Sequence, residues 1–218
     1  MTLRIAFAAA AVLAGPLLHA TVIQVSQPAP DYLAATTLLS ITAPPQSFVT
    51  SISDGTLTVS FSNSGSPVVM DVDTVPDSWA TWGSPADTES ATPTVLAPDD
   101  GPLVTSLLFQ FDQALSVFGV ELEPDDTSAS HQIAAEYFLG GVSQGVISID
   151  VSGNAGARLF AAEGAFFDSV MISSDVDFGS AEFRYALAPE PCGVWLVGLA
   201  CAAGGVVGRR AQRSKSAK

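Results

Sequence analysis

One pentapeptide in this sequence matches a known catalytic pattern. Residues 141–145, Gly-Val-Ser-Gln-Gly, have the form G-x-S-x-G. In hydrolases this pattern places a nucleophilic serine on a sharp turn between a strand and a helix. Here a strand-like run follows, and the one histidine between residues 21 and 187, His131, precedes Ser143, whereas the hydrolase order places histidine last. The pattern therefore predicts a β-hairpin loop.

His131 also has no companion ligands for a transition metal. Zinc sites combine several histidine or cysteine side chains. Residues 21–187 contain no cysteine and no second histidine. We therefore expect a surface histidine at the start of a strand, with neither a zinc centre nor a cysteine nucleophile in this part of the chain.

Carboxylates offer two other kinds of chemistry. Asp71, Asp73 and Asp77 occur in the segment DVDTVPD, and a spacing of two places Asp71 and Asp73 on the same face of a strand. Calcium takes several oxygen ligands from loops, although no segment has the glycine and distal glutamate of an EF-hand. Solvated acidic loops and a calcium site at these three aspartates are both open interpretations. A pair of carboxylates for glycoside hydrolysis is a further alternative.

Two tryptophans lie three positions apart in a polar segment. Trp79 and Trp82 occur in PDSWATWGSP. Exposed aromatic rings can stack on sugar rings, which makes these two residues the candidates for ligand contact. The alternative interpretation is that both rings cap an open edge of a hydrophobic core.

The segments that must position these residues are predicted to be strands. Apolar and polar residues alternate with a period of two, as in strands with one buried face. The alternation covers residues 56–62, 107–113, 146–152 and 181–187, and further candidates are 22–26, 36–42, 67–72, 132–139, 157–161 and 168–173. Clusters of Pro, Gly, Asp and Ser separate them, and no helical periodicity of useful length occurs. The pattern predicts an all-β protein with one antiparallel β-sandwich domain, jelly-roll-like, over residues 21–187.

Two irregularities are expected within this sandwich. The inward-facing positions run through Leu115 and Val117 and then change to Val120 and Leu122. Because a slip of one residue exposes a buried face, a β-bulge at Gly119 would absorb this change. The longest irregular segment runs from about residue 76 to residue 102, and long irregular loops are often functional.

The N-terminal segment, residues 1–20, has the layout of a secretory signal peptide. Arg4 precedes an apolar stretch, and small Ala20 ends it. We expect the Sec machinery to export the chain and cleavage to fall between Ala20 and Thr21; an uncleaved N-terminal anchor is the alternative.

The C-terminal segment, residues 188–218, forms a separate region. Residues 192–208 are apolar throughout, and as a helix they would span about 26 Å, near the lower limit for a bilayer. The tail 209–218 is basic, which predicts that it stays inside while the rest of the chain faces outward. Both cysteines of the chain, Cys192 and Cys201, lie in the apolar stretch; we interpret them as apolar filler, and lipidation of Cys192 is the alternative.

The charge is distributed unevenly along the chain. Residues 21–187 contain 21 of the 22 acidic residues, against two basic residues, Arg158 and Arg184. A surface this acidic repels nucleic acids and anionic headgroups. The composition therefore excludes nucleic-acid binding and favours cations, cationic partners or simple solubility.

The C-terminal region resembles the PEP-CTERM sorting signal. The resemblance rests on Pro189-Glu190-Pro191, the short apolar stretch and Arg209-Arg210, which follow one another in that order. It implies processing by an exosortase in the inner membrane and release to the cell surface or an extracellular matrix, often one rich in exopolysaccharide. Cys192 directly after the triplet departs from the commoner small or hydroxyl residue. The segments FQFDQALSVFGVELEPDD, AFFDSVMIS and FGSAEFRYAL also resemble a β-sandwich domain common in such proteins.

Three functions follow as expectations. The first is an exported, surface-associated or matrix protein without catalytic activity. The second is a carbohydrate-binding module, assisted by calcium, that uses Trp79, Trp82 and the acidic loops. The third is a polysaccharide hydrolase built on acidic loop residues.

Overall fold

The structure, a computed structural model, describes residues 21–27, 29–99 and 103–189. The predicted signal peptide with Ala20, the predicted span at 192–208 and the sorting-motif residues Glu190, Pro191, Arg209 and Arg210 lie outside the described residues. Within the described residues no helix has the length and apolar character needed to cross a membrane.

The described residues form strands joined by loops, with one short helix. The elements are β1 (Ile23–Val25), α1 (Pro30–Ala35), β2 (Thr37–Leu38), β3 (Phe48–Val49), β4 (Ser51–Ser53), β5 (Thr58–Asn63), β6 (Ser66–Pro67), β7 (Met70–Thr74), β8 (Thr94–Pro98), β9 (Ser106–Pro124), β10 (Ser130–Leu139), β11 (Val142–Ser152), β12 (Arg158–Glu163), β13 (Phe167–Ser173) and β14 (Phe178–Leu187). All strand pairs are antiparallel. The prediction of an all-β antiparallel fold is confirmed.

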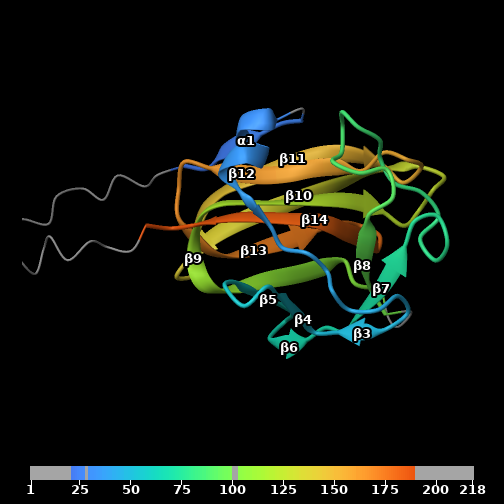
Figure 1. Cartoon of the computed structure of the whole chain (residues 1–218), viewed down its shortest axis with the longest axis horizontal. Helices are drawn as coiled ribbons and strands as arrows, with labels where there is room; N and C mark the ends of the chain where they lie inside the picture. The colour runs from blue at the N-terminus through green and yellow to red at the C-terminus, as the bar shows by residue number, and fades with distance from the viewer. Residues whose placement is uncertain (1–20, 28, 100–102, 190–218) are drawn as a thin grey trace, which may run out of the picture.

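Strand β9 organises the sandwich. It is 19 residues long and pairs with β5, β12, β13 and β14. The main strand order is β11-β10-β13-β9-β14-β8-β7-β3. Figure 1 shows β9 curving around one end of the molecule, so that its two halves belong to opposite layers.

The core between the layers is rich in phenylalanine. Phe109 lies 5.5 Å from Phe61 and 5.6 Å from Phe183, measured between ring centroids. Phe118 completes the group at 6.3 Å from Phe109. These four rings are almost fully buried, and they come from strands that the sequence pattern predicts.

Four elements have no counterpart among the predicted segments: the short strands β3 and β4, strand β8 and helix α1. Strand β8 carries Val95, Leu96 and Ala97, which are all buried, so apolar and polar residues do not alternate along it. Helix α1 is only six residues long and begins at Pro30, which suits the first helical position. Its Tyr32 is the residue that packs against β9 and β12.

The predicted bulge exists in β9, but it does not fall at Gly119. Leu187 pairs with Leu115 and Ala186 pairs with Val117, which leaves Ser116 as the extra residue. The Ser116 hydroxyl bonds the carbonyl of Leu187 at 3.1 Å. After this bulge Phe118, and not Val117, faces the main core, so the change of face in β9 comes three positions earlier than predicted. A second register shift does lie next to Gly119, between the pairs Arg184–Gly119 and Ala181–Glu121, but its extra residue is on β14.

Gly119 is required for a different reason, the close approach of Tyr32. A Cβ atom at Gly119 would overlap the Tyr32 hydroxyl and would lie 2.7 Å from the Cβ of Ala161. We expect Gly119→Ala to lower the free energy of unfolding by about 1–3 kcal/mol, the usual cost of overpacking. Chemical denaturation of the β-sandwich domain measures this change.

The control for this prediction uses the Tyr32 hydroxyl itself. That hydroxyl is buried and has no hydrogen-bond partner within the described structure. Tyr32→Phe removes the atom that the new Cβ would meet, so Gly119→Ala should cost clearly less in a Tyr32→Phe background. An equal cost in both backgrounds would contradict the assigned overlap.

Both chain ends leave the sandwich at the same pole. The Val22 N–H donates to the Gln144 carbonyl at 3.1 Å, and the Ala188 N–H donates to the Ala114 carbonyl at 2.9 Å. Between these two points lies the β12–β13 turn, because Glu163 pairs with Ile23 while Phe167 and Leu187 both pair with Leu115. Figure 1 shows the blue and the orange ends of the described chain on the same side.

Candidate functional site

A pocket lined by acidic residues lies at the pole opposite the chain ends. Its volume is about 240 Å³. The lining residues come from β7, β8, the 75–93 loop and the turns at 125 and 177; they are Asp71, Asp73, Ser78, Trp79, Ala97, Pro98, Asp99, Asp125, Asp177 and Phe178. We call it the acidic pocket.

The local strand geometry explains why carboxylates gather there. Asp71 and Asp73 flank the fully buried Val72 on β7, so both project away from the core, as the spacing predicted. The Asp125 N–H donates to the Asp177 carbonyl at 2.9 Å, which joins the turn after β9 to the turn before β14. The Asp177 carboxylate accepts the Val104 N–H at 2.5 Å. These bonds hold in place the turns that line the pocket, and the aspartates around it provide oxygen acceptors.

The pocket does not combine the three aspartates considered for calcium. Asp71 and Asp73 line it, whereas Asp77 is not among the lining residues. Across the described ranges, no group of three or more His, Cys, Asp or Glu side chains is placed to hold a metal ion. The carboxylates can still accept hydrogen bonds from hydroxyl groups of a ligand.

Trp79 and Trp82 are buried, with 8% and 3% of their surface exposed. They pack with Val95, Ala157 and Ala181 in a small second core under the 75–93 loop. Sugar stacking requires exposed ring faces, and this burial removes the basis on which the two rings were candidates for ligand contact. The arrangement matches the alternative interpretation, in which they cap an edge of the core.

Two buried glutamates hold these tryptophans. The Trp79 indole N–H donates to Glu123 at 3.0 Å, and the Trp82 indole N–H donates to Glu121 at 3.1 Å. Glu121 also accepts the Glu89 N–H at 2.7 Å. Both carboxylates are fully buried and lie on one face of β9, two positions apart. The 75–93 loop, which supplies one wall of the acidic pocket, is thus fixed by side chains of a central strand.

The site residues that sequence reasoning missed are these two glutamates. The sequence does contain a signal for them, since the segment VELE places two acidic residues at alternate positions of an otherwise apolar strand. Such a pattern indicates a second face that is either solvated or paired with polar partners. Nothing in the spacing identifies Trp79 and Trp82, which lie much earlier in the chain, as those partners.

Burial controls the ionisation of Glu121. Desolvation raises the pKa of this carboxyl to about 8, against the opposing effect of its bonds to Trp82 and the Glu89 N–H. The same cause raises the pKa values of Glu123 and Glu182. A group whose pKa is higher in the folded state binds its proton more tightly there, so folding is favoured at low pH.

This shift predicts that the protein loses stability as pH rises. The contribution of Glu121 is fully present below its unfolded pKa of 4.5 and is lost as pH rises through about 8. We expect a lower midpoint of thermal unfolding at about pH 8.5 than at about pH 5.5. Near-ultraviolet circular dichroism of the buried tryptophans is the readout.

Two variants separate Glu121 from other groups in the same pH range. The amide side chain of Glu121→Gln cannot ionise, so this variant should show a smaller change of the unfolding midpoint with pH. His131 also has a raised pKa, chiefly through its bond to Asp175, so His131→Asn removes a second contribution of the same sign. A midpoint that increases between these two pH values would contradict the assignment.

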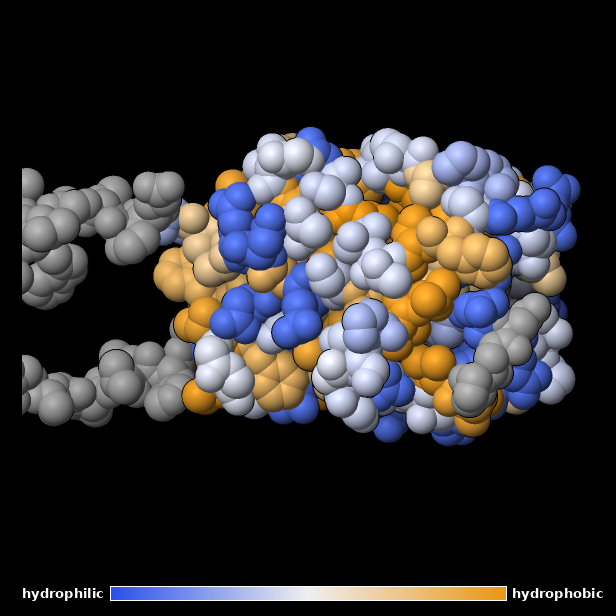
Figure 2. Space-filling model, turned by 90° about the horizontal axis from the view of Figure 1, so that it is seen from below, coloured by the Kyte–Doolittle hydropathy of each residue, from blue (hydrophilic) through white to orange (hydrophobic). Residues whose placement is uncertain are grey.

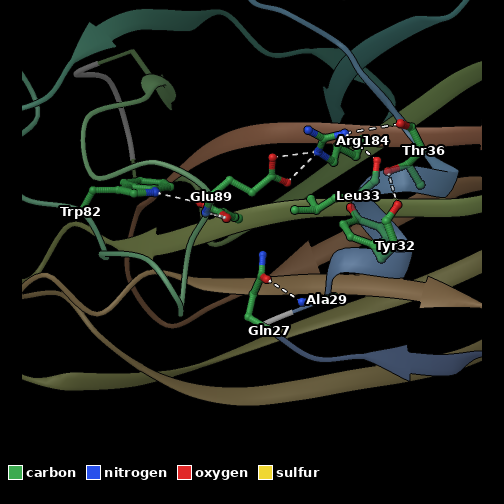
Figure 3. Close-up of polar contacts among 9 residues, drawn as sticks. Gln27, Ala29, Tyr32, Leu33, Thr36, Trp82, Glu89 and Arg184 are labelled. Carbon is green, nitrogen blue, oxygen red and sulfur yellow. Dashed lines mark hydrogen bonds and ion pairs between the residues drawn. The ribbon is translucent and has the colours of Figure 1, made fainter.

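A charged pair also ties the 75–93 loop to the region of α1. The Arg184 Nε lies 2.7 Å from the Glu89 carboxylate, and both side chains are largely buried. The other end of the guanidinium donates to the carbonyls of Leu33 and Thr36 in the α1 region. Figure 3 shows Arg184 between Glu89 and these carbonyls, so one cation joins the loop to α1.

His131 and the G-x-S-x-G pentapeptide take structural roles. His131 is partly buried rather than free on the surface, and its ring nitrogens lie 2.8 Å from Asp175 and 3.2 Å from Asp126. The pentapeptide lies at the β10–β11 turn, as predicted, with Ser143 paired to Phe138 in the hairpin. The structure does not bring Ser143 and His131 together, because they lie toward opposite ends of that hairpin.

No protein-family model matches the sequence, and no curated protein matches it. Several solved structures are similar in fold. A family 61 carbohydrate-binding module in complex with β-1,4-galactotriose is 13% identical, with 62% of this chain and 90% of that module covered and a TM-score of 0.33. The family 11 module of Clostridium thermocellum in complex with a β-1,3-1,4-mixed-linked tetrasaccharide is 13% identical, with 71% and 97% covered and a TM-score of 0.30.

The enzymatically active domain of tailspike protein 4 of bacteriophage CBA120 is also similar. It is 17% identical, with 62% of this chain and 20% of that chain covered and a TM-score of 0.30. At such identities and TM-scores, these similarities say nothing about what this chain binds or whether it is an enzyme.

Proposed function

We propose that the protein is an exported, non-catalytic surface or matrix protein whose β-sandwich is held at the membrane by its C-terminal region until an exosortase processes it. The observation that carries this proposal is the position of the two chain ends. Both leave from one pole, and the described chain reaches Pro189, at the start of the Pro-Glu-Pro triplet. The apolar stretch begins at residue 192. A domain tethered in this way presents its opposite pole to the surroundings.

The charge distribution supports the same orientation. The opposite pole carries the acidic pocket, with Asp73, Asp99 and Asp177 among its lining, and the nearby pair Asp126 and Asp175. An acidic surface is repelled by anionic headgroups. A domain that points this pole away from the membrane avoids that repulsion.

The proposed absence of catalysis rests on how the buried carboxylates are used. Glu121 and Glu123 each accept an indole N–H and a backbone N–H, so both act as supports for the 75–93 loop. A general acid or base must instead reach a substrate. The polysaccharide hydrolase alternative is excluded if the purified protein shows no turnover on polysaccharide extracts.

The sorting triplet provides the test of this proposal. In cells that contain an exosortase, we expect replacement of Pro189, Glu190 and Pro191 by alanine to leave an unprocessed chain in the membrane fraction, while the parent chain is shortened and released. Ala188→Ser, one position before the triplet, is the matched control and should be processed normally. Normal processing of the triple variant would refute the sorting proposal.

A second candidate function is carbohydrate binding in the acidic pocket. The observation that favours it is the set of five aspartates around a pocket whose lining also includes Trp79 and Phe178. Sugar hydroxyls donate to carboxylates, and apolar sugar faces contact aromatic carbons. Calcium assistance remains part of this candidate.

Affinity electrophoresis in gels containing exopolysaccharide tests the second candidate. A double variant, Asp73→Asn with Asp99→Asn, should lose the retardation of the parent protein, whereas Asp150→Asn on β11 should keep it. The gels are run with calcium and with a chelator. Equal mobility of the parent protein in gels with and without polysaccharide, under both conditions, would remove this candidate.

A further inference from the structure

The pole from which the chain ends leave has an unusual set of exposed apolar side chains. Six large apolar residues there are exposed by 37–59%, and we call this set the apolar pole: Ile23, Leu139, Val142, Val146, Phe166 and Leu187. Phe166 is 49% exposed and Ile23 is 59% exposed. Phe166 lies in the β12–β13 turn and the other five lie on strands. Exposed apolar side chains gathered in one place mark an interaction surface.

These residues belong to one surface because their elements converge on the β12–β13 turn. Ile23 pairs with Glu163 at the start of that turn, and its side chain lies beside Gly164. The tip of the β10–β11 hairpin is joined to the start of β13, directly after that turn, by the Gly140 N–H, which donates to Asp168 at 2.7 Å. Figure 2 shows apolar surface at the end of the molecule next to the grey chain ends.

The length of the connection limits how far this pole can lie from the apolar stretch. Cys192 comes five positions after Leu187 in the sequence. A fully extended chain of that length spans at most about 18 Å. If residues 192–208 cross the membrane, the apolar pole lies within that distance of the point where they enter it.

We propose that the apolar pole lies against the lipid bilayer while the chain is anchored, with Phe166 and Ile23 inserted among the headgroups. The inference rests on the proposed function, which supplies the anchor. It adds direct contact with the bilayer: the domain stands on this pole, which holds the acidic pocket away from the membrane. Apolar side chains of this kind enter about 5–10 Å into the boundary between headgroups and acyl chains.

The charges at this pole determine how the contact is made. Neither arginine of the domain is free to contact headgroups there: Arg158 begins β12, at the end away from the β12–β13 turn, and Arg184, on β14, is paired with Glu89 and bonded to the carbonyls of Leu33 and Thr36. The acids near the pole are Glu163, which is exposed, Glu136, which pairs with Val146, and Asp168, whose carboxylate accepts the Gly140 N–H and the Ser169 hydroxyl. The contact is therefore apolar and should change little with salt, unlike the attraction of basic segments to anionic lipids.

Depth-dependent quenching in vesicles tests this orientation on the chain of residues 21–218. Residues 21–187 contain no cysteine, so Cys192→Ser with Cys201→Ser gives a background for single labelling. A polarity-sensitive dye is attached at Phe166→Cys or, as a matched control, at Phe48→Cys. Phe48 is an aromatic residue of similar exposure, 61%, and it lies on β3, away from the chain ends. The vesicles contain phosphatidylethanolamine, phosphatidylglycerol and a spin-labelled lipid quencher.

We expect quenching at position 166 to exceed that at position 48 by about twofold or more, as insertion to headgroup depth requires. Flotation of the same samples reports the anchor separately. Chains that fail to float would refute the anchor itself, and with it the proposed function. Chains that float but show equal quenching at both positions would overturn the orientation alone. Efficient 166-to-166 cross-linking without quenching would assign the apolar pole to a second copy of the chain and would also overturn it.

Discussion

An Arg184→Ala variant is expected to lose about 3–5 kcal/mol of unfolding free energy, the usual cost of removing one partner of a buried ion pair. Arg184 is 16% exposed and Glu89 is 11% exposed, so the remaining carboxylate would stay buried without its cation. The carboxyl of Glu182 lies near Glu89 as well, and after desolvation the Glu89 charge is the next cause of its raised pKa. The variant would also release the carbonyls of Leu33 and Thr36.

Denaturant titration followed by tryptophan fluorescence measures this loss, and Arg158→Ala is the matched control. Arg158 is the other arginine of the domain, and its pair with Asp87 is longer, at 3.5 Å, and more exposed. Exposed pairs contribute about 1 kcal/mol or less. If the two variants lost equal stability, Arg184 could not be the cation that joins the 75–93 loop to α1.

A Glu123→Ala variant is expected to destabilise the wall of the acidic pocket by about 3 kcal/mol or more, because buried donors would lose their acceptor. Glu123 accepts from the Trp79 indole, the Gly156 N–H and the Thr81 hydroxyl, at 3.0, 3.0 and 3.3 Å. Without the carboxylate, the 75–93 loop should open and Trp79 should become hydrated. A red shift of tryptophan emission together with lower stability is the expected result.

Two further variants establish whether the lost acceptors cause this effect. Glu123→Gln keeps one acceptor oxygen and should fall between the parent protein and Glu123→Ala. Glu163→Ala removes an exposed glutamate from the edge of the same sheet and should change stability little. A Glu123→Ala variant with parental stability and unshifted emission would contradict the supporting role of this carboxylate.

The strands that could be predicted from the sequence are those with one covered face. The alternation in 56–62 and 181–187 corresponds to β5 and β14, because solvent or polar partners on one side leave a period of two. Strand β8 was missed because both of its faces are covered: three consecutive residues are buried, so apolar and polar residues do not alternate. The bulge was expected because the inward-facing positions change from odd-numbered to even-numbered residues. This change alone could not distinguish Ser116 from Gly119 as the extra residue.

The candidate site was harder to predict than the fold. Asp71 and Asp73 were found because their shared face depends only on local spacing. The burial of Trp79 and Trp82 depends on Glu121 and Glu123, whose distance along the chain gives no local signal. A polar loop composition suggested exposure, whereas long-range hydrogen bonds to a central strand decide the outcome.

The central claim is that this domain is exported and processed at its C-terminal region, with both chain ends at the membrane-facing pole. Intact-mass measurement of the native protein, combined with cell fractionation, tests it most directly. We expect a chain that begins at Thr21, ends near the Pro189–Pro191 region and is found outside the cell. A chain that retains residues 192–218 in the inner membrane would contradict the sorting claim and would leave a simple single-span anchor.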